Sequence, residues 1–199
     1  MKEYIIAKKN VDLDWNQIEA APIDCCLWIP PAEVSAEARV CYDADAVYVQ
    51  LRAKEKHIRA EETGPVGMPC LDSCLEFFFC PIPENRTYFN IEMNPNRCLY
   101  LGIGTDRYDG IRLLPHGENF LNAEVTRDPE GWSVSYIVPI SFIQRFFPDF
   151  RAESGRKIRG NFFKCGDYTV KPHYYAWNPI ELEKPDFHRS EFFGTMIFE

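Results

Sequence analysis

Short runs of apolar and aromatic residues, each closed by a turn, recur along the whole chain and leave little room for helices. Three pairs of runs flank turn-forming residues and predict β-hairpins. Their strands span residues 37–42 and 46–53, 87–94 and 97–104, and 121–127 and 131–139. Further strands are expected at 72–80, 157–165, 173–177 and 192–198. Because so many short strands follow one another, the pattern predicts a β-sandwich or barrel.

Only one segment predicts a helix, Ser141 to Phe147, with Ser141 as its N-cap and Pro148 as its stop. Aromatic residues are 15% of the chain and prolines number 15, and both values favour strands and connections over helices. No repeat, linker or low-complexity tract divides the sequence. The predicted fold is therefore all-β, an antiparallel β-sandwich (jelly-roll or immunoglobulin-like) with one short helix, in a single domain over residues 1–199.

Two of the expected strands, 72–80 and 87–94, alternate between two kinds of side chain. Since successive side chains of a strand point to opposite faces, their odd positions predict a core face. These positions are Leu75, Phe77, Phe79, Phe89, Ile91 and Met93. The even positions bring Asp72, Glu76, Asn90 and Glu92 to one surface. Such a surface is either the solvated face of an antiparallel sheet or a polar binding site.

Trp177 ends the strand at 173–177 and precedes Asn178–Pro179, so it is expected at a strand end, where loops build sites. A tryptophan ring there is a flat platform for the C–H face of a sugar, while amide and carboxylate groups bind the hydroxyls. His173 and Tyr175 share its face. The alternative is a core tryptophan that anchors the last strands. The other three tryptophans, Trp15, Trp28 and Trp132, are assigned to core or edge packing.

The net charge of −8 argues against nucleic acid and anionic membranes as partners, and no apolar run approaches a membrane span. The stretch Tyr4–Ala7 is too short for a signal peptide, which predicts a cytoplasmic protein. The eight cysteines are then expected as reduced thiols. Cys70 and Cys74 are close in sequence, but no second Cys/His pair matches them, so the spacing predicts no metal site.

No motif for nucleophilic, phosphate-binding or zinc-dependent catalysis is present in the sequence. Asp72 and Glu76 suggest a glycosidase pair, but residues four apart on one strand are about 13 Å apart, which exceeds both glycosidase spacings. Glu76 and a cross-strand Glu92 would come nearer. A glycoside-processing enzyme that uses Glu76 and Glu92 is therefore kept as an alternative.

Several segments, in their order, resemble family 9 carbohydrate-binding modules. They are the hairpin at Tyr42–Val49, the D-x-x-x-E strand at Asp72–Phe79, the strand from Gly131 to Pro139, and the ending with Ala176–Pro179 and Phe187–Gly194. Together they span nearly the whole chain. The resemblance implies a β-sandwich that binds a mono- or disaccharide, or the end of a glycan chain, without catalysing a reaction.

In such modules two aromatic rings sandwich the sugar and polar side chains bind its hydroxyls. By this resemblance Trp177 matches the later aromatic and Glu76 the strand carboxylate, while Asn90 and Glu92 supply polar contacts from the next strand. Lys164 and Tyr175 complete the expected ligand-binding set. The family's earlier aromatic has no counterpart here, because the matching segment is Gly67-Met68-Pro69-Cys70.

The family also carries structural calcium, whose ligands the sequence does not identify, and no other cofactor is expected. Asp43 and Asp45 are assigned to a turn rather than to calcium. Haem is a further alternative, since related sandwich domains hold it between a Met and a His or Lys. Met68, Met93, His173 and Lys164 are available for that role, but the attachment motif C-x-x-C-H is missing from the sequence.

Overall fold

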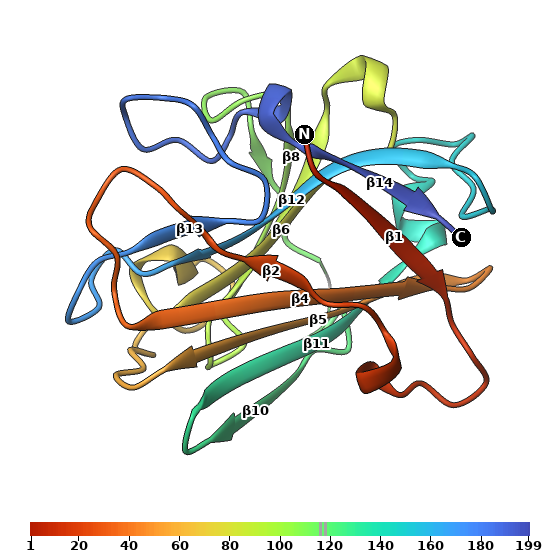
Figure 1. Ribbon diagram of the computed structural model, residues 1–199. Coiled ribbons are helices and arrows are strands. Elements are labelled where there is room, and N and C mark those ends of the chain that lie inside the picture. Colours follow the sequence, from red (N-terminus) through yellow and green to blue (C-terminus); the bar gives the residue numbers. More distant parts are fainter. Residues whose placement is uncertain (116, 118) are drawn as a thin grey trace.

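The structure is a computed structural model that describes residues 1–115, 117 and 119–199, and strands dominate it (Figure 1). Its strands are β1 Glu3–Lys8, β2 Ala21–Ile23, β3 Cys25–Cys26, β4 Val34–Tyr42, β5 Ala46–Glu55, β6 Cys74–Cys80, β7 Tyr88–Met93, β8 Leu99–Gly104, β9 Ile111–Arg112, β10 Glu124–Asp128, β11 Gly131–Pro139, β12 Lys157–Cys165, β13 Tyr174–Ala176 and β14 Gly194–Phe198. Within the described residues the single α-helix is α1, Ile140–Ile143, and short 3-10 turns lie at Trp15–Gln17, Pro69–Leu71, Pro83–Asn85 and Ser190–Phe192. The predicted all-β class is confirmed.

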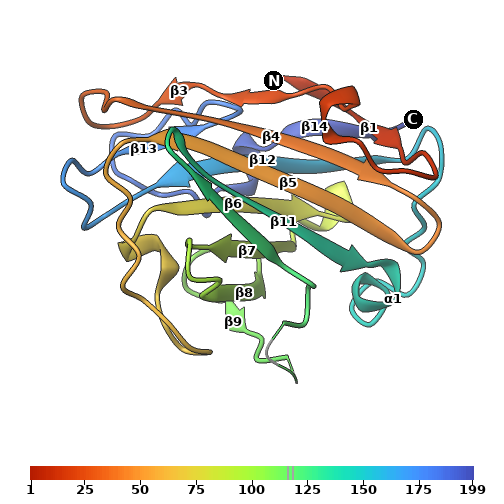
Figure 2. The same cartoon turned by 90° about the horizontal axis from the view of Figure 1, so that it is seen from below.

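The strands join into one mixed sheet rather than two separate antiparallel ones. Its order is β10-β11-β5-β4-β1-β14-β12-β6-β7-β8-β9, and β2, β3 and β13 pair alongside this path. β1 lies parallel to both β4 and β14 and so links the two halves of the sheet, as Figure 1 shows at its centre. The sheet curls, with the β4-β5-β11 half lying across the half that contains β6, β12 and β13 (Figure 2). The expected antiparallel sandwich is therefore not confirmed.

The main core lies between the two halves of the curled sheet. It takes Val49 and Leu51 from β5, Trp132 and Val134 from β11, and the odd positions of β6 and β7. Phe77 and Phe89 are 1% and 0% exposed, so the predicted core face is confirmed. We call this side of β6, β7, β12 and β13 the inner face.

The opposite side of β6, β7, β12 and β13, the outer face, is also covered. A second apolar cluster there packs Cys74, Phe78 and Phe163 against Phe187 and Phe193, which lie between β13 and β14. The rings of Phe163 and Phe187 stack with centroids 4.2 Å apart. The even positions of β6 are therefore buried rather than solvated. Strands buried on both faces carry near-continuous apolar runs, as the sequence of β6 does.

The three predicted hairpins are confirmed as β4–β5, β7–β8 and β10–β11. The helix prediction is partly wrong. Helix α1 starts one residue earlier than expected and holds four residues, and its N-cap is Pro139, so Ser141 caps nothing. Asp43 forms the first turn as expected, because its carboxylate accepts from the N–H groups of Asp45 and Ala46. Among the described residues, no helix is both long and apolar enough to cross a membrane.

A buried polar group closes one end of the main core. Lys164 on β12 forms an ion pair with Glu55 on β5 at 3.2 Å, and its ammonium also hydrogen-bonds His173 at 2.8 Å. Glu55 in turn accepts from the Trp132 indole at 2.6 Å and from the Ser73 hydroxyl at 2.9 Å. Since each buried charge has partners of the opposite sign or hydrogen-bond donors, the group ties β5, β11 and β12 together.

Candidate functional site

A pocket of about 330 Å³ opens on the outer face, above β6, β7 and β8. Aromatic rings, carboxylates, two cysteines and a few basic groups line it. The lining consists of Trp28, Met68, Cys70, Glu76, Glu92, Tyr100, Arg107, Cys165, Asp167, Tyr174, Pro185, Asp186, Phe187 and His188. We call it the outer-face pocket. It combines apolar walls with a few polar groups, as small-molecule sites do.

The floor of the outer-face pocket is a pair of glutamates. Glu76 on β6 and Glu92 on β7 are direct cross-strand partners, and they are 2% and 6% exposed. The Cys165 thiol donates to Glu76 Oε1 at 2.9 Å. Asn90 Nδ2 donates to Glu92 Oε1 at 2.9 Å, which fixes the orientation of that carboxyl group. Asn90 Oδ1 is buried and has no hydrogen-bond partner among the described residues.

Burial makes both floor carboxyls weak acids. Burial raises the pKa of Glu76 well above its usual range, and the neighbouring Glu92 charge raises it further. Burial likewise raises the pKa of Glu92 to about 7, although the Asn90 hydrogen bond opposes the shift. No ion pair of the described ranges involves either glutamate. A carboxyl that keeps its proton both donates and accepts, which suits a neutral ligand rich in hydroxyls.

Aromatic side chains form the walls of the outer-face pocket. Trp28, which follows β3, lies against Phe187 and Tyr174 with ring centroids 5.5 and 5.8 Å apart. Its indole N–H donates to the Leu182 carbonyl at 2.8 Å, so the ring is held in place on one edge. Tyr100 on β8 is half-buried and stacks under the Arg112 guanidinium at 4.6 Å. These rings supply the flat apolar surface that a sugar ring needs.

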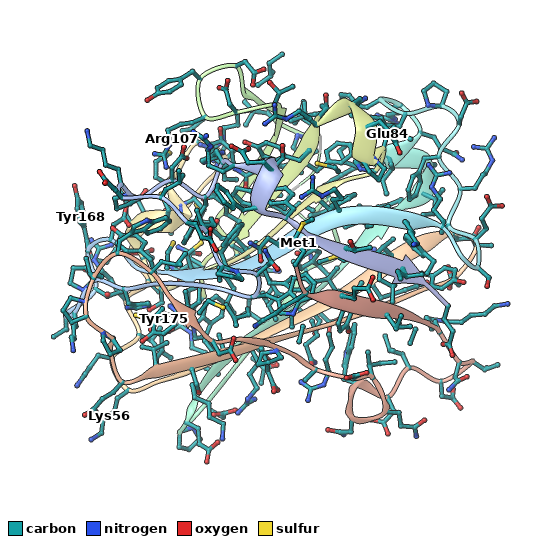
Figure 3. All side chains as sticks on the ribbon, turned by 45° about the horizontal axis from the view of Figure 1, so that its top comes forward. Met1, Lys56, Glu84, Arg107, Tyr168 and Tyr175 are labelled. Atoms are coloured by element: carbon teal, nitrogen blue, oxygen red, sulfur yellow. The ribbon has the colours of Figure 1, made fainter. Side chains whose placement is uncertain are left out.

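Charged groups from two loops lie at the rim. Arg107, from the β8–β9 loop, donates to Asp186 at 3.2 Å, and Figure 3 labels it in the upper part of the molecule. The His188 ring bonds to the Tyr88 hydroxyl at 2.8 Å, and burial together with the Arg107 charge lowers its pKa to about 4. His188 is thus neutral at physiological pH and leaves Arg107 as the cation of the rim.

Strand register separates the six predicted ligand-binding residues into two groups. Phe163 on β12 is opposite Glu76 on one side and Ala176 on the other. Residues directly opposite each other point to the same face, so Ala176 shares the outer face with Glu76, and Trp177 points to the inner face. Lys164 is likewise opposite Leu75 and Tyr175, and all three point inward. Glu76, Asn90 and Glu92 are brought together; Trp177, Lys164 and Tyr175 are not with them.

Trp177 is a core residue rather than an exposed platform. Its ring is 3% exposed and packs against Phe162 and Tyr4, with centroids 5.8 and 6.3 Å apart. Gly194 lies directly beside the ring. The expectation of a partly exposed ring near Glu76 is therefore wrong, and the packing alternative describes its position. The expectation fails because Trp177 points to the same face of the sheet as Phe162, the inner face, whereas Phe163 points to the outer face.

Lys164 and Tyr175 also have structural partners. Lys164 is 0% exposed and belongs to the ion pair with Glu55 described above. The Tyr175 hydroxyl accepts from the Ala32 N–H and donates to its carbonyl at 3.0 and 3.1 Å. Asp72, expected beside Glu76, is buried just before β6, where Arg59, Asn94 and the N–H groups of Glu61 and Glu62 engage its carboxylate.

The side-chain cluster that could hold a metal ion does not suit calcium. Among the described residues, one group of three or more His, Cys, Asp or Glu side chains lies close enough to share an ion, namely Cys74, Glu76 and Cys165. Two of these three are thiols, whereas calcium prefers six to eight oxygen ligands. The haem alternative gains no support either. Met93 is in the core at 1% exposure, and His173 and Lys164 bond each other.

A larger cavity of about 500 Å³ lies beside β8 and the described residues 113–115, 117, 119–121 and 123. Its lining is mainly aliphatic, with Met93, Leu99 and Leu121 among its residues, and it contains no carboxylate among the described residues. The outer-face pocket is therefore the better candidate site, since it alone of the two joins aromatic walls to buried carboxyl groups.

Most of the residues that surround the floor do not follow from the sequence pattern. It predicts packing for Trp28 and singles out none of Tyr100, Tyr174, Arg107 and Asp167. Tyr100 had a usable signal, since it is opposite Glu92 on β8 and the predicted β7–β8 hairpin implies that register. Trp28 had none, because it follows a two-residue strand and reaches the pocket only through the pairing of β3 with β13.

Comparison with known proteins adds a family to this geometry. A sequence profile described as carbohydrate-binding family 9 matches residues 7–198. A solved structure from Bacteroides uniformis, of a protein to which carbohydrate binding is ascribed, is 27% identical, has a TM-score of 0.82, and matches 100% of this chain and 99% of its own. No curated protein matches the chain.

Two further structures are of family 9 modules from Caldicellulosiruptor kristjanssonii. One, in complex with cellotriose, has 12% identity and a TM-score of 0.68 over 100% of this chain and 94% of its own. The other, in complex with glucose, has 11% identity and a TM-score of 0.69 over 100% and 96%. At these identities the two matches establish a common fold.

Proposed function

Because the chain belongs to carbohydrate-binding family 9, we propose that it binds a small sugar or the end of a glycan chain in the outer-face pocket, without catalysing a reaction. The observation that carries the proposal is a pocket of about 330 Å³ that has aromatic walls and a floor of two buried carboxyl groups. A volume near the lower end of the roughly 300–1,000 Å³ range of small-molecule sites suits a mono- or disaccharide.

In the proposed binding mode, the aromatic walls contact the apolar face of the sugar ring and the floor binds its hydroxyl groups. Trp28 and Tyr174 would contact the C–H face of the ring, and Glu92 would exchange hydrogen bonds with hydroxyls. Asn90 would act through Glu92, whose carboxyl it orients. Met68, which is 41% exposed at the rim, stands in the segment where the family's earlier aromatic is missing, and its thioether supplies an adaptable apolar contact. One good aromatic wall supports an affinity of about millimolar to micromolar.

Calorimetry with glucose and cellotriose, followed by a glycan array, tests the proposal. These two sugars are in complex with the Caldicellulosiruptor modules and are therefore the first probes. Trp28→Ala should weaken binding by about tenfold or more, since aromatic anchors dominate such sites. Trp15→Ala is the matched control, because Trp15 is also half-buried but lines a different surface, beside β4 and β5. A wild-type chain that binds no sugar on the array would refute the proposal.

A second candidate function is glycoside cleavage, which the cross-strand pair of Glu76 and Glu92 supports. Two carboxyl groups close together are what a retaining glycosidase uses. We favour binding because both groups rise from one floor and would meet a sugar from the same side, whereas the two catalytic carboxyls flank the bond that breaks. Hydrolysis of aryl glycosides by the wild type, lost in Glu76→Gln, would decide for the enzyme.

A further inference from the structure

Two cysteines and one glutamate meet beneath the outer-face pocket. Cys74 on β6 and Cys165 on β12 are direct cross-strand partners, and Glu76 is two residues along β6 on the same face. Their Sγ and carboxylate oxygen atoms all lie within 4.8 Å of one another, and the Cys165 thiol is 2.9 Å from Glu76 Oε1. The three residues are 0%, 2% and 2% exposed in the order Cys74, Glu76, Cys165.

We propose that Cys74, Glu76 and Cys165 form a binding site for a thiophilic divalent cation of the zinc type, with Cys70 as the fourth ligand. Cys70 lies in the turn before β6 and lines the same pocket, and its carbonyl is 3.8 Å from the Cys165 thiol. No sequence spacing could indicate this set, because its members come from residues 70–76 and 165 and only the pairing of β6 with β12 unites them.

The geometry matches a tetrahedral zinc ion. Zinc–sulfur bonds of about 2.3 Å and zinc–oxygen bonds of about 2.1 Å place neighbouring ligand atoms roughly 3.6–3.8 Å apart. The Cys165 thiol and Glu76 Oε1 are closer than that value, at 2.9 Å, and the ligand atoms of Cys74, Glu76 and Cys165 all lie within 4.8 Å of one another, so side-chain rotations bring these three to tetrahedral spacing. The Cys70 thiol lies outside this set and would turn inward to become the fourth ligand. β6 and β12 are interior strands of the sheet, and ligands on packed strands are held precisely.

The chemistry of the ligands selects the class of ion. Thiolates prefer zinc and other soft ions, whereas calcium and magnesium take oxygen ligands. Without a cation the thiols keep their protons, because burial raises the pKa of Cys74 and the contacts with Cys74 and Glu76 raise that of Cys165. On binding, these protons leave to the solvent, and the two positive charges of the ion offset two of the four negative charges that the ligand set then carries. Lys164, the basic residue next to Cys165, points to the inner face and pairs with Glu55 instead.

Cobalt titration of the full chain tests the site. The protein is reduced with a phosphine, freed of metal with a chelator, and titrated with Co²⁺. We expect thiolate-to-cobalt charge-transfer absorption and the visible bands of tetrahedral cobalt, both saturating at one ion per chain and both lost when one equivalent of Zn²⁺ is added. A wild-type chain without a charge-transfer band would overturn the proposal.

Substitutions identify the ligands. Cys165→Ser and Cys74→Ser should each abolish the cobalt spectrum or weaken binding by at least about tenfold. Cys80→Ser is the matched control, since Cys80 is also buried on the outer face of β6 but its thiol contacts the Arg86 carbonyl. If Cys80→Ser removes the spectrum as Cys165→Ser does, the assignment is wrong.

X-ray absorption of the zinc-loaded wild type gives a readout that needs no variant. Two or three sulfur neighbours at about 2.3 Å are expected, and a shell of oxygen and nitrogen alone would overturn the site. A Cys74–Cys165 disulfide in air, with no metal bound after reduction, would also overturn it. The test is separate from sugar binding. A chain that binds cobalt but no sugar retains this site and loses the proposed function, and the reverse result does the opposite.

Discussion

Replacing Trp177 by alanine separates packing from binding most directly. The backbone N–H of Trp177 donates to the Phe162 carbonyl at 2.9 Å, and its ring is 3% exposed between Tyr4 and Phe162. Removing the ring would leave a cavity in the main core beside β1, β12 and β14. Because the surrounding strands are hydrogen-bonded on both sides, we expect little collapse into that cavity.

The expected cost follows from this burial. Large-to-small substitutions of a core tryptophan lower the free energy of unfolding by about 3–5 kcal/mol. For a chain of this length each kcal/mol corresponds to roughly 2–4 °C, so the melting temperature should fall by about 6–20 °C. Since a domain is stable by only about 5–15 kcal/mol, the variant should fold at low temperature but be visibly weakened.

Urea unfolding and sugar titration on the same samples give the measurement. At low temperature the folded Trp177→Ala protein should keep the wild-type affinity for any sugar that the wild type binds, since the ring lies on the inner face. Trp28→Ala should show the reverse pattern, with a smaller loss of stability and a larger loss of affinity. A Trp177→Ala variant with unchanged urea midpoint and abolished sugar binding would refute the assignment of Trp177 to the core.

Three further predictions concern the core and its polar end. Gly194→Ala should lower the free energy of unfolding by about 1–3 kcal/mol, because the added Cβ would lie 2.6 Å from Cη2 of the Trp177 ring; an unchanged urea midpoint would contradict this close packing. Lys164→Met should cost about 3–5 kcal/mol in the same assay at pH 7, because Glu55 would stay buried without its cation, whereas a neutral result would mean that solvent reaches Glu55. Burial and the Lys164 charge lower the pKa of His173 to about 4 in the folded protein, whereas the pKa in the unfolded chain is about 6.5. Between pH 6.5 and pH 4 only the unfolded chain therefore gains the proton, and the free energy of unfolding should fall by up to about 3 kcal/mol as the pH drops through this window. In urea unfolding at a series of pH values, His173→Asn should flatten the dependence of the free energy of unfolding on pH.

Local sequence pattern predicted ten of the fourteen strands that the structure describes, because each depends on near neighbours, but it did not predict β1, β2, β3 or β9. Alternation in β6 and β7 assigned Phe77 and Phe89 to the core, and the turns fixed three hairpins. Within the β6–β7 pair the polar set also followed, since a hairpin-like antiparallel register brings Glu76 opposite Glu92. The pattern did not reveal β1 as a parallel link between the two halves, because parallel pairing joins segments far apart in the chain.

The candidate site was only half predictable, and the errors have one physical cause. Parity along a strand says which residues share a face, but it does not say which face, and that choice depends on the register with neighbouring strands. For Trp177 the register runs through Phe163, which pairs with Glu76 and Ala176 at once; a slip of one residue in β13 would turn Trp177 to the outer face and Ala176 to the core. The same register brings Cys165 to Cys74 and so creates the thiol pair that spacing had excluded. Sequence thus limits the chemistry available to this pocket, whereas the pairing of β12 with β6 and β13 decides which residues perform it.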